Sequence, residues 1–233
     1  MKTLGIIGGI GPGSTVDYYQ TIIDLYRARI GDGSYPPILI NSIDVQRVLA
    51  TVGAGELKAL TEWLLTELQK LERGGADFAI MASNTPHIVF DDLERRSPLP
   101  LISIVAQTAA VAKSRGLKRL GLFGTRFTMQ GTVYRNVFAA QEMVVIQPEP
   151  ADLDYIHEKY MSELVAGVFL PETRAGLLRI VNRMTEQSGI DGVILGGTEL
   201  PLILREPAHN GIPLLNTTRI HCEAAVSRMF SQR

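Results

Sequence analysis

Short runs of consecutive apolar residues recur along the chain, separated by longer stretches in which apolar residues return every three or four positions. Continuous apolar runs of strand length are typical of strands buried on both faces of a parallel sheet. We predict strands at 3–7, 37–41, 78–82, 101–104, 119–123, 144–147, 192–195 and 214–216, and helices at 14–29, 56–73, 105–114, 129–140, 154–167, 171–188 and 217–230. Because strand and helix alternate throughout, the pattern predicts an α/β fold.

Three blocks of this pattern occur twice, in the same order. Residues 4–9, 76–85 and 99–103 reappear as residues 120–125, 190–199 and 212–216, so the second copy follows the first by 116, 114 and 113 residues (Leu4 to Leu120, Ala76 to Ile190, Pro100 to Pro213). The repeat predicts two pseudo-symmetric domains, each a parallel-rich sheet flanked by helices.

Each copy carries a short polar segment directly after an apolar strand and before an expected helix. These segments are Ser-Asn-Thr-Pro at 83–86 and Gly-Thr-Glu-Leu at 197–200. Ligands of parallel sheets bind where loops leave the carboxyl ends of strands, and free N–H groups at a helix start favour a carboxylate. The pattern therefore predicts a small anionic ligand held between Ser83 and Gly197.

Composition limits the classes of protein to which the chain can belong. Apolar residues make up 45% of its 233 residues and charged residues 20%, which is enough for a large buried core. A formal net charge of −1 argues against a nucleic-acid partner. No apolar stretch approaches the ~20 residues that a membrane helix needs, and the first apolar run is too short for a secretory signal, so we expect a cytoplasmic protein.

The chain contains one cysteine, Cys222, which excludes an intramolecular disulfide and a multi-cysteine metal site. We expect Cys222 to be a packed structural thiol within a helix. On the helix at 56–73, Trp63 and Leu65 fall off the apolar stripe. They are candidates for a second contact, such as the subunit interface of a homodimer or another homo-oligomer.

Four motifs together resemble the cofactor-independent aspartate/glutamate racemase family, over essentially the whole chain. They are Gly-Gly-x-Gly-Pro at 8–12, Asn-Thr-x-His at 84–87, Gly-Thr-x-x-Thr at 124–128 and Gly-Thr-Glu-Leu at 197–200. The resemblance implies two pseudo-symmetric domains with the ligand cleft between them, and no cofactor. It also implies that strands 100–103 and 213–216 each complete the opposite half, so that the first domain comprises 1–99 plus 208–233 and the second 100–207.

The resemblance further implies two cysteines on opposite sides of the substrate α-carbon, at positions 83 and 197. This chain has Ser83 and Gly197 there. A serine hydroxyl is too weak an acid to replace a thiol without an adjacent base, and glycine has no side chain. Both residues also have structural interpretations: Ser83 as a helix N-cap, and Gly197 as a tight turn that requires close approach or a positive φ.

Other groups would then have to carry the proton. In addition to Ser83, the candidate catalytic residues are His87 and Glu199, because histidine titrates near neutrality and a carboxylate at a helix start stays ionised. The alternatives are a structural histidine and a capping glutamate. Gly197 marks the family's second catalytic position.

Candidate substrate-binding groups lie in the same polar segments and in the loop after the second strand. The resemblance extends recognition of an acidic side chain to Arg47, a suitable fork for a carboxylate. The remaining candidates are Asn84, Thr85, Thr125, Thr128 and Thr198, and no metal site is expected. Residues 167–170 are apolar where the family sometimes has a basic residue, so a substrate with an apolar side chain is the alternative to aspartate or glutamate.

These residues favour an amino-acid racemase-like isomerase that binds a small amino or carboxylic acid. Its proton transfer is expected to be weak or altered. The alternative is a non-catalytic binding protein that keeps the same scaffold and carboxylate site.

Overall fold

The computed structural model describes residues 1–231, which form two compact units. Unit 1 comprises Met1–Ile104 together with the segment that begins at His221, and unit 2 comprises Val105–Ile220. The units therefore change over at 104/105 and 220/221, rather than at the expected 99/100 and 207/208. None of the described helices combines the length and the apolar content that crossing a bilayer demands.

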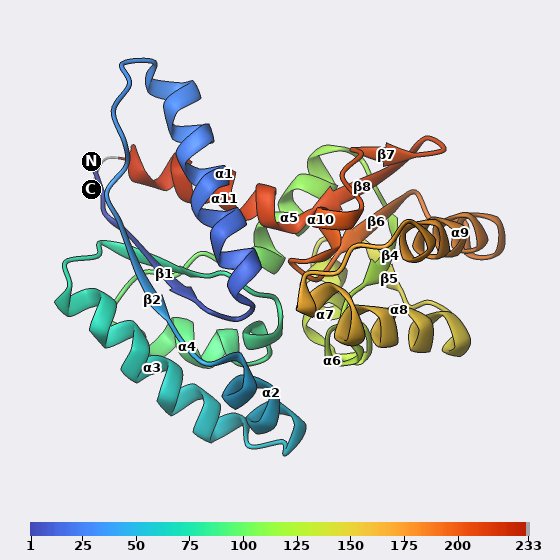
Figure 1. The fold of residues 1–233 in the computed structure, drawn as a ribbon, viewed down its shortest axis with the longest axis horizontal. Coiled ribbons are helices and arrows are strands. Elements are labelled where there is room, and N and C mark those ends of the chain that lie inside the picture. Colours follow the sequence, from blue (N-terminus) through green and yellow to red (C-terminus); the bar gives the residue numbers. More distant parts are fainter. Residues whose placement is uncertain (232–233) are drawn as a thin grey trace. The chain divides into compact units, whose positions relative to one another are not determined.

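Unit 1 contains a parallel sheet of order β2-β1-β3 (Figure 1). Its strands are β1 (Leu4–Gly8), β2 (Ile38–Ser42) and β3 (Phe78–Met81). The helices of this unit are α1 (Pro12–Ile30), α2 (Val45–Gly53), α3 (Leu57–Arg73), η1 (Thr85–Val89), α4 (Phe90–Arg96) and the greater part of α11 (Thr217–Met229).

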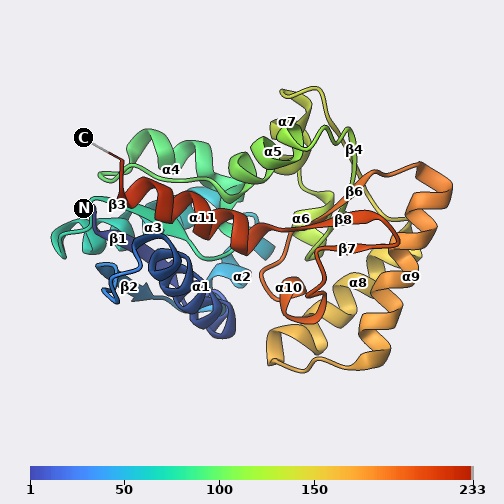
Figure 2. The same ribbon diagram turned by 90° about the horizontal axis from the view of Figure 1, so that it is seen from above.

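Alternating residues of β1 and β3 bury the two faces of this sheet in separate cores. Leu4, Ile6, Phe78 and Ile80 pack with α1 and α11, whereas Ile7 and Met81 pack with α2, α3 and α4. Figures 1 and 2 show α1 and α11 side by side on one face. Because both faces are covered, these strands are uninterrupted apolar runs, as the sequence pattern predicts.

Unit 2 contains a five-stranded sheet of order β5-β4-β6-β8-β7. Its strands are β4 (Arg119–Phe123), β5 (Val144–Ile146), β6 (Gly192–Leu195), β7 (Ala208–His209) and β8 (Ile212–Asn216). All pairs are parallel except β7 with β8. Its helices are α5 (Ile104–Ser114), α6 (Arg126–Gln130), α7 (Val133–Ala139), α8 (Pro150–Ser162), η2 (Leu164–Ala166), α9 (Pro171–Ser188) and α10 (Leu200–Ile203).

One repeated contact shows how closely the two copies correspond. In unit 1, the Asp77 carboxylate accepts the Thr3 N–H at 2.7 Å, and the Asp77 N–H donates to the Thr3 carbonyl at 2.9 Å. In unit 2, Asp191 accepts the Arg119 N–H at 3.0 Å and its own N–H donates to the Arg119 carbonyl at 2.8 Å. An aspartate at the equivalent position of each copy thus fixes the chain before β3, or before β6, to the segment at the start of the neighbouring strand.

The expected exchange of strands between halves does not occur. Leu101 forms a parallel bridge with Ala79 of β3, and β8 pairs with β6 of its own half. The segments that change units are the following helices, since α5 belongs to unit 2 and α11 mostly to unit 1. Sequence repetition revealed the two strands but not their partners, because the match between 100–103 and 213–216 is equally compatible with either pairing.

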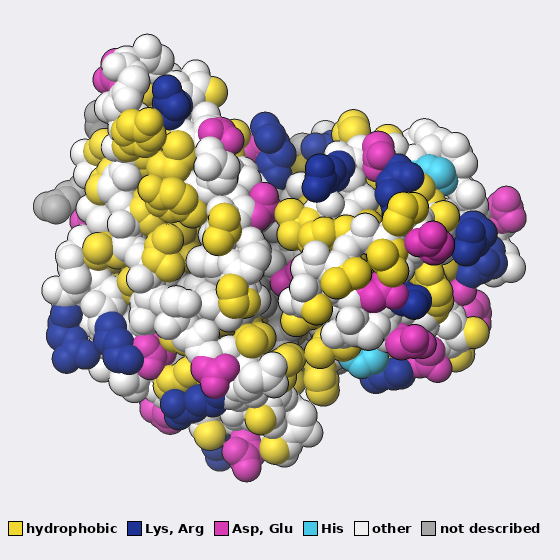
Figure 3. All heavy atoms as spheres, in the orientation of Figure 1, with side chains coloured by type: hydrophobic (Ala, Val, Ile, Leu, Met, Phe, Trp, Pro, Cys, Tyr) yellow, Lys and Arg dark blue, Asp and Glu magenta, His cyan; other side chains and the backbone are white. Residues whose placement is uncertain are grey.

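Charged side chains are interspersed over the surface that Figure 3 shows. Lysine and arginine alternate with aspartate and glutamate on this face. Exposed ion pairs of the described residues include Arg96 with Glu62 and Arg126 with Asp154. Such exposed pairs contribute only about 0–1 kcal/mol each, so the buried cores carry most of the stability.

Candidate functional site

Ser83 and Asn84 follow β3 at the carboxyl edge of the unit 1 sheet. Both side chains are buried, at 6% and 7% exposure, and Thr85 beside them is half-buried. The residue that precedes η1 is Asn84, and its side chain makes no capping hydrogen bond. Ser83 is therefore not the N-cap of this helix. Its backbone carbonyl instead accepts a hydrogen bond from the His87 ring at 3.0 Å.

His87 is buried with both ring nitrogens bonded to the backbone. Nδ1 donates to the Ser83 carbonyl, and Nε2 accepts the Ile104 N–H at 3.2 Å. Burial, helped by the nearby His221, lowers the pKa of His87 to about 3. The ring is consequently neutral, and its one lone pair is occupied by a backbone N–H. This geometry favours the structural interpretation of His87 over a role as base.

His221 is a second buried histidine, which the sequence reasoning missed. Its Nε2 donates to the Ile102 carbonyl at 2.9 Å, and its Nδ1 accepts the Tyr18 hydroxyl at 3.0 Å. Burial lowers the pKa of His221 to about 4. The neighbouring Cys222 is also buried, as predicted for a packed thiol. The sequence around His221 does not indicate these hydrogen bonds, because both partners lie far from it along the chain.

Gly197 follows β6 at the equivalent edge of unit 2, where a tyrosine packs directly against it. Its φ is not positive, so the turn does not require glycine for that reason. A Cβ at position 197 would lie 2.6 Å from the Tyr160 hydroxyl oxygen, a separation that side chains cannot adopt. Close approach is therefore what requires glycine here, and the ring of Tyr160 fills the space that a side chain at 197 would occupy.

Tyr160 also contacts Glu199, two residues after Gly197. The Tyr160 hydroxyl donates to Glu199 Oε2, and Thr198 Oγ1 donates to the same oxygen at 3.2 Å. Burial and the Glu199 charge raise the pKa of Tyr160 well above its ordinary value, so the phenol stays protonated and remains a donor. Glu199 precedes α10 but makes no capping hydrogen bond with its side chain. The result is a buried carboxylate held by two hydroxyl groups.

Thr125 and Thr128 follow β4 at the same edge of unit 2. Thr125 is the N-cap of α6, because its Oγ1 accepts the Thr128 N–H at 3.3 Å, and the two hydroxyl oxygens lie 3.1 Å apart. The next residue, Arg126, donates its N–H to His157 Nδ1 at 3.2 Å. Burial and the Arg126 charge lower the pKa of His157, which lies one helical turn before Tyr160.

Arg47 lies in α2, which begins directly after the loop from β2. Asp44 caps this helix by accepting the Gln46 N–H at 2.9 Å. The Arg47 side chain is exposed, and its guanidinium carbon lies 4.1 Å from the centre of the Trp63 ring. A cation–π contact of this kind leaves the guanidinium N–H groups free to bind an anion.

The predicted site residues thus gather at one edge in each unit. Unit 1 brings together Ser83, Asn84, Thr85 and His87 after β3 and Arg47 after β2; unit 2 brings together Thr125 and Thr128 after β4 and Gly197, Thr198 and Glu199 after β6. Tyr160 was missed, because nothing near it in the sequence signals its contact with position 197. Over residues 1–231, no group of histidine, cysteine, aspartate or glutamate side chains could hold a metal ion.

Comparisons with known proteins extend over nearly the whole chain. A family model described as Asp/Glu/Hydantoin racemase matches residues 7–225. The chain is 23% identical over 232 residues to the broad specificity amino-acid racemase RacX of Bacillus subtilis (strain 168), covering 96% of each chain. The structure of an aspartate racemase homologue from Pyrococcus horikoshii OT3 is 30% identical with a TM-score of 0.84, covering 99% of this chain and 100% of that one. Picrophilus torridus aspartate racemase shares the fold, with a TM-score of 0.78, 22% identity and coverage of 100% and 96%.

Proposed function

Because this chain belongs to the Asp/Glu/Hydantoin racemase family, we propose that it is an amino-acid racemase-like isomerase with weak or altered proton transfer. Its substrate would be a small amino or carboxylic acid. The proposal rests on the residues at the two positions where the family resemblance implies cysteines. With Ser83 and Gly197 there, and its one cysteine buried elsewhere, the chain lacks a thiol pair for racemisation.

The buried pair of Tyr160 and Glu199 is the observation that carries the altered chemistry. Racemisation needs one group that removes the α-proton and another that returns a proton on the opposite face. Glu199 is the proposed base in unit 2, since a carboxylate held by two hydroxyl groups keeps an accepting oxygen in a fixed position. Ser83 is the proposed contact in unit 1, where His87 supplies no free lone pair.

Arg47 is the proposed site for a substrate carboxylate in unit 1, together with the hydroxyl and amide groups of Thr85 and Asn84. Its exposed guanidinium supports this assignment. Thr198 is the proposed substrate-binding group of unit 2. The apolar residues at 167–170 do not select for an acidic side chain of the substrate. RacX of Bacillus subtilis is itself a broad specificity amino-acid racemase. Both acidic and apolar amino acids therefore belong in the test.

A non-catalytic binding protein is the second candidate. It is favoured by the position of Tyr160, which blocks the space beside Gly197 that a proton carrier would need. In this case the carboxylate-binding residues would remain while the proton-transfer groups are lost. The two candidates predict the same binding but different exchange of the α-proton.

The test measures binding and α-proton exchange separately. D- and L-aspartate, glutamate and alanine are titrated by calorimetry, and their α-proton exchange in D₂O is followed by NMR. We expect measurable binding with slow exchange, and we expect Glu199→Gln to abolish that exchange while Glu206→Gln, at an exposed position of unit 2, leaves it unchanged. Rapid racemisation of aspartate or glutamate would contradict weak proton transfer. Binding without exchange would favour the second candidate, and absence of both would overturn the two together.

A further inference from the structure

Arg47 contacts an aromatic ring, whereas several other arginines of this chain contact a carboxylate. Arg95, Arg96, Arg126, Arg174 and Arg183 each contact a carboxylate. Within the described residues, the Arg47 guanidinium has no such ion pair and contacts the face of the Trp63 ring. Its charge is therefore not neutralised by the protein, although its position is defined by an aromatic surface.

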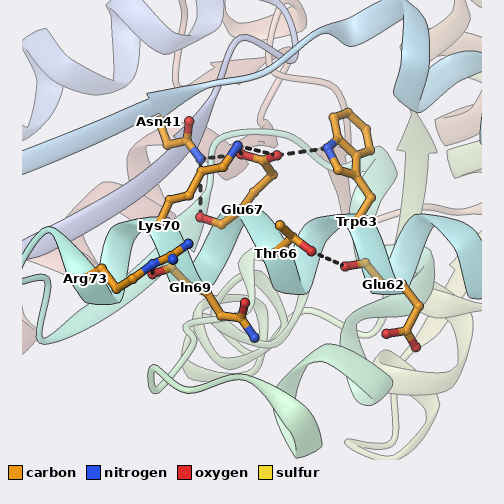
Figure 4. Close-up of polar contacts among 8 residues, drawn as sticks. All are labelled: Asn41, Glu62, Trp63, Thr66, Glu67, Gln69, Lys70 and Arg73. Atoms are coloured by element: carbon orange, nitrogen blue, oxygen red, sulfur yellow. Dashed lines mark hydrogen bonds and ion pairs between the residues drawn. The ribbon is translucent and has the colours of Figure 1, made fainter.

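Trp63 is itself held in place by a buried acid. Its indole N–H donates to Glu67 Oε1 at 3.0 Å, one turn further along α3 (Figure 4). Glu67 is 5% exposed, so this hydrogen bond is largely shielded from water. Because an indole has a single N–H donor, the bond fixes one edge of the ring and with it the direction that the ring face presents.

The Glu67 carboxylate is held by two further side chains. Lys70 Nζ lies 2.8 Å and 2.7 Å from its two oxygens, and Asn41 Nδ2 donates to Oε2 at 2.8 Å. Burial raises the pKa of Glu67, but the hydrogen bonds from Lys70, Asn41 and Trp63 outweigh it, so the pKa lies below its ordinary value. The acid is thus ionised, and Asn41 connects it to the carboxyl end of β2.

The contacts form a continuous chain from the sheet to the exposed arginine. Asn41 of β2 binds Glu67 of α3, Glu67 binds the Trp63 indole, and Trp63 supports Arg47 of α2. An arginine side chain loses rotamer entropy when a ligand fixes its guanidinium. A guanidinium already stacked on a fixed ring has lost part of that freedom and keeps its N–H edges available.

We propose that Trp63 is a positioning residue: anchored by Glu67, it holds the Arg47 guanidinium in the orientation that binds a ligand carboxylate. This inference rests on the proposed function, since it assumes that Arg47 binds the carboxylate of a small acid. It assigns Trp63 a role other than the subunit contact expected from its place off the apolar stripe. That contact stays a prediction.

The test is a double-mutant cycle on ligand affinity. The Kd values of L-aspartate and L-glutamate are measured by calorimetry for the wild type, Trp63→Leu, Arg47→Leu and the double variant. We expect Arg47→Leu to raise Kd about tenfold and Trp63→Leu to raise it about two- to fivefold. If Trp63 acts through Arg47, Trp63→Leu has no further effect when Arg47 is already leucine.

Two further variants separate positioning from a structural effect. Trp63→Phe keeps an aromatic face for the guanidinium and should bind more tightly than Trp63→Leu. Arg96→Leu removes an arginine of α4 that is paired with Glu62 of α3, the helix that carries Trp63, and should leave Kd unchanged. Thermal unfolding of each variant checks that unit 1 is folded.

Trp63 is also the single tryptophan of the chain, so its fluorescence reports this contact directly. We expect Arg47→Leu to change the emission of the ligand-free protein. We also expect L-aspartate and L-glutamate to change the emission of the wild type, and the Kd from this titration should equal the calorimetric Kd. Additive effects of the two substitutions, with normal wild-type binding, would overturn the positioning role alone. Failure of the wild type to bind either acid or any other amino acid tested would overturn it together with the proposed function.

Discussion

At the scale of single residues, the contact between Gly197 and Tyr160 decides whether a thiol can be introduced at position 197. A Cβ there would lie 2.6 Å from the Tyr160 hydroxyl oxygen, so the ring or the turn would have to move. Overpacking of this kind typically costs about 1–3 kcal/mol. We therefore predict that Gly197→Cys alone destabilises the protein by about this amount, measured by urea unfolding.

The matched control is Gly13→Cys, because an added Cβ at Gly13 has no neighbour within 4 Å and its φ is not positive. This change should cost less than Gly197→Cys. Tyr160→Ala should cost less stability in the Gly197→Cys background than in the wild type, because the ring and the thiol then no longer compete for the same space. The triple variant Ser83→Cys, Gly197→Cys, Tyr160→Ala should then raise α-proton exchange in D₂O above the wild-type rate. If Gly197→Cys and Gly13→Cys unfold alike, Tyr160 does not block the position.

Which site residues could be predicted depends on where their partners lie in the sequence. The Ser83 and Gly197 segments were found because they repeat and follow recognisable strands. The interpretation of Gly197 as a close approach could be stated, but not its partner, since Tyr160 precedes it by 37 positions. For Trp63, the sequence indicated its position off the apolar stripe of its helix, but not its contacts with Glu67 and Arg47. Glu67 was not among the candidate residues, because its three donors lie on Asn41, Trp63 and Lys70 and nothing in the sequence marks these contacts.

At the scale of elements, strands and long helices follow from the apolar pattern, and short elements do not. β4, β6 and α9 occupy their predicted residues, because each is a regular run with clear ends. The helix predicted at 129–140 is instead α6 and α7, separated near Gly131, where a Cβ would lie 2.6 Å from the Phe127 carbonyl oxygen. α2 was not predicted, since the residues after Asp44 were considered only as a loop with a binding arginine.

The two buried histidines connect elements whose contact the sequence does not reveal. His221 joins α11 to the Tyr18 hydroxyl of α1 and to the Ile102 carbonyl, and His87 joins η1 to the start of α5. Both are neutral in the fold, with pKa values of about 4 and about 3, while an unfolded histidine has a pKa of about 6.5. Between these values the unfolded chain binds more protons than the folded one.

The free energy of unfolding should therefore carry no penalty from these two histidines well above pH 6.5, and it should fall as the pH decreases towards 4. The expected loss at pH 5, relative to pH 7, is about 2 kcal/mol for each histidine. Urea unfolding at several pH values measures it. His221→Gln should reduce the pH dependence by about 2 kcal/mol whatever its effect at pH 7. An unchanged dependence in His221→Gln would show that this histidine is already charged in the fold.

At the scale of the whole molecule, the chain returns to unit 1 only at its last helix. Unit 1 draws on residues before 105 and from 221 on, so part of its core arrives after unit 2 has been completed in sequence. Cys222, Ala225, Val226 and Met229 of α11 pack with Leu4, Tyr18 and Phe78. Unit 2 is one continuous segment with its own sheet, so we expect it to fold without that closing contact.

This organisation predicts that damage to α11 unfolds unit 1 selectively. Ala225 is fully buried, so Ala225→Asp places a charge in the apolar core and should cost unit 1 about 3 kcal/mol or more. Trp63 lies in unit 1, and its fluorescence should report a transition at lower urea. Circular dichroism should show a second transition, from unit 2, near the wild-type midpoint. Ser227→Asp adds the same charge at an exposed position of α11 and should leave both probes nearly unchanged. Coincident transitions in Ala225→Asp would instead mean that the two units unfold as a single cooperative block.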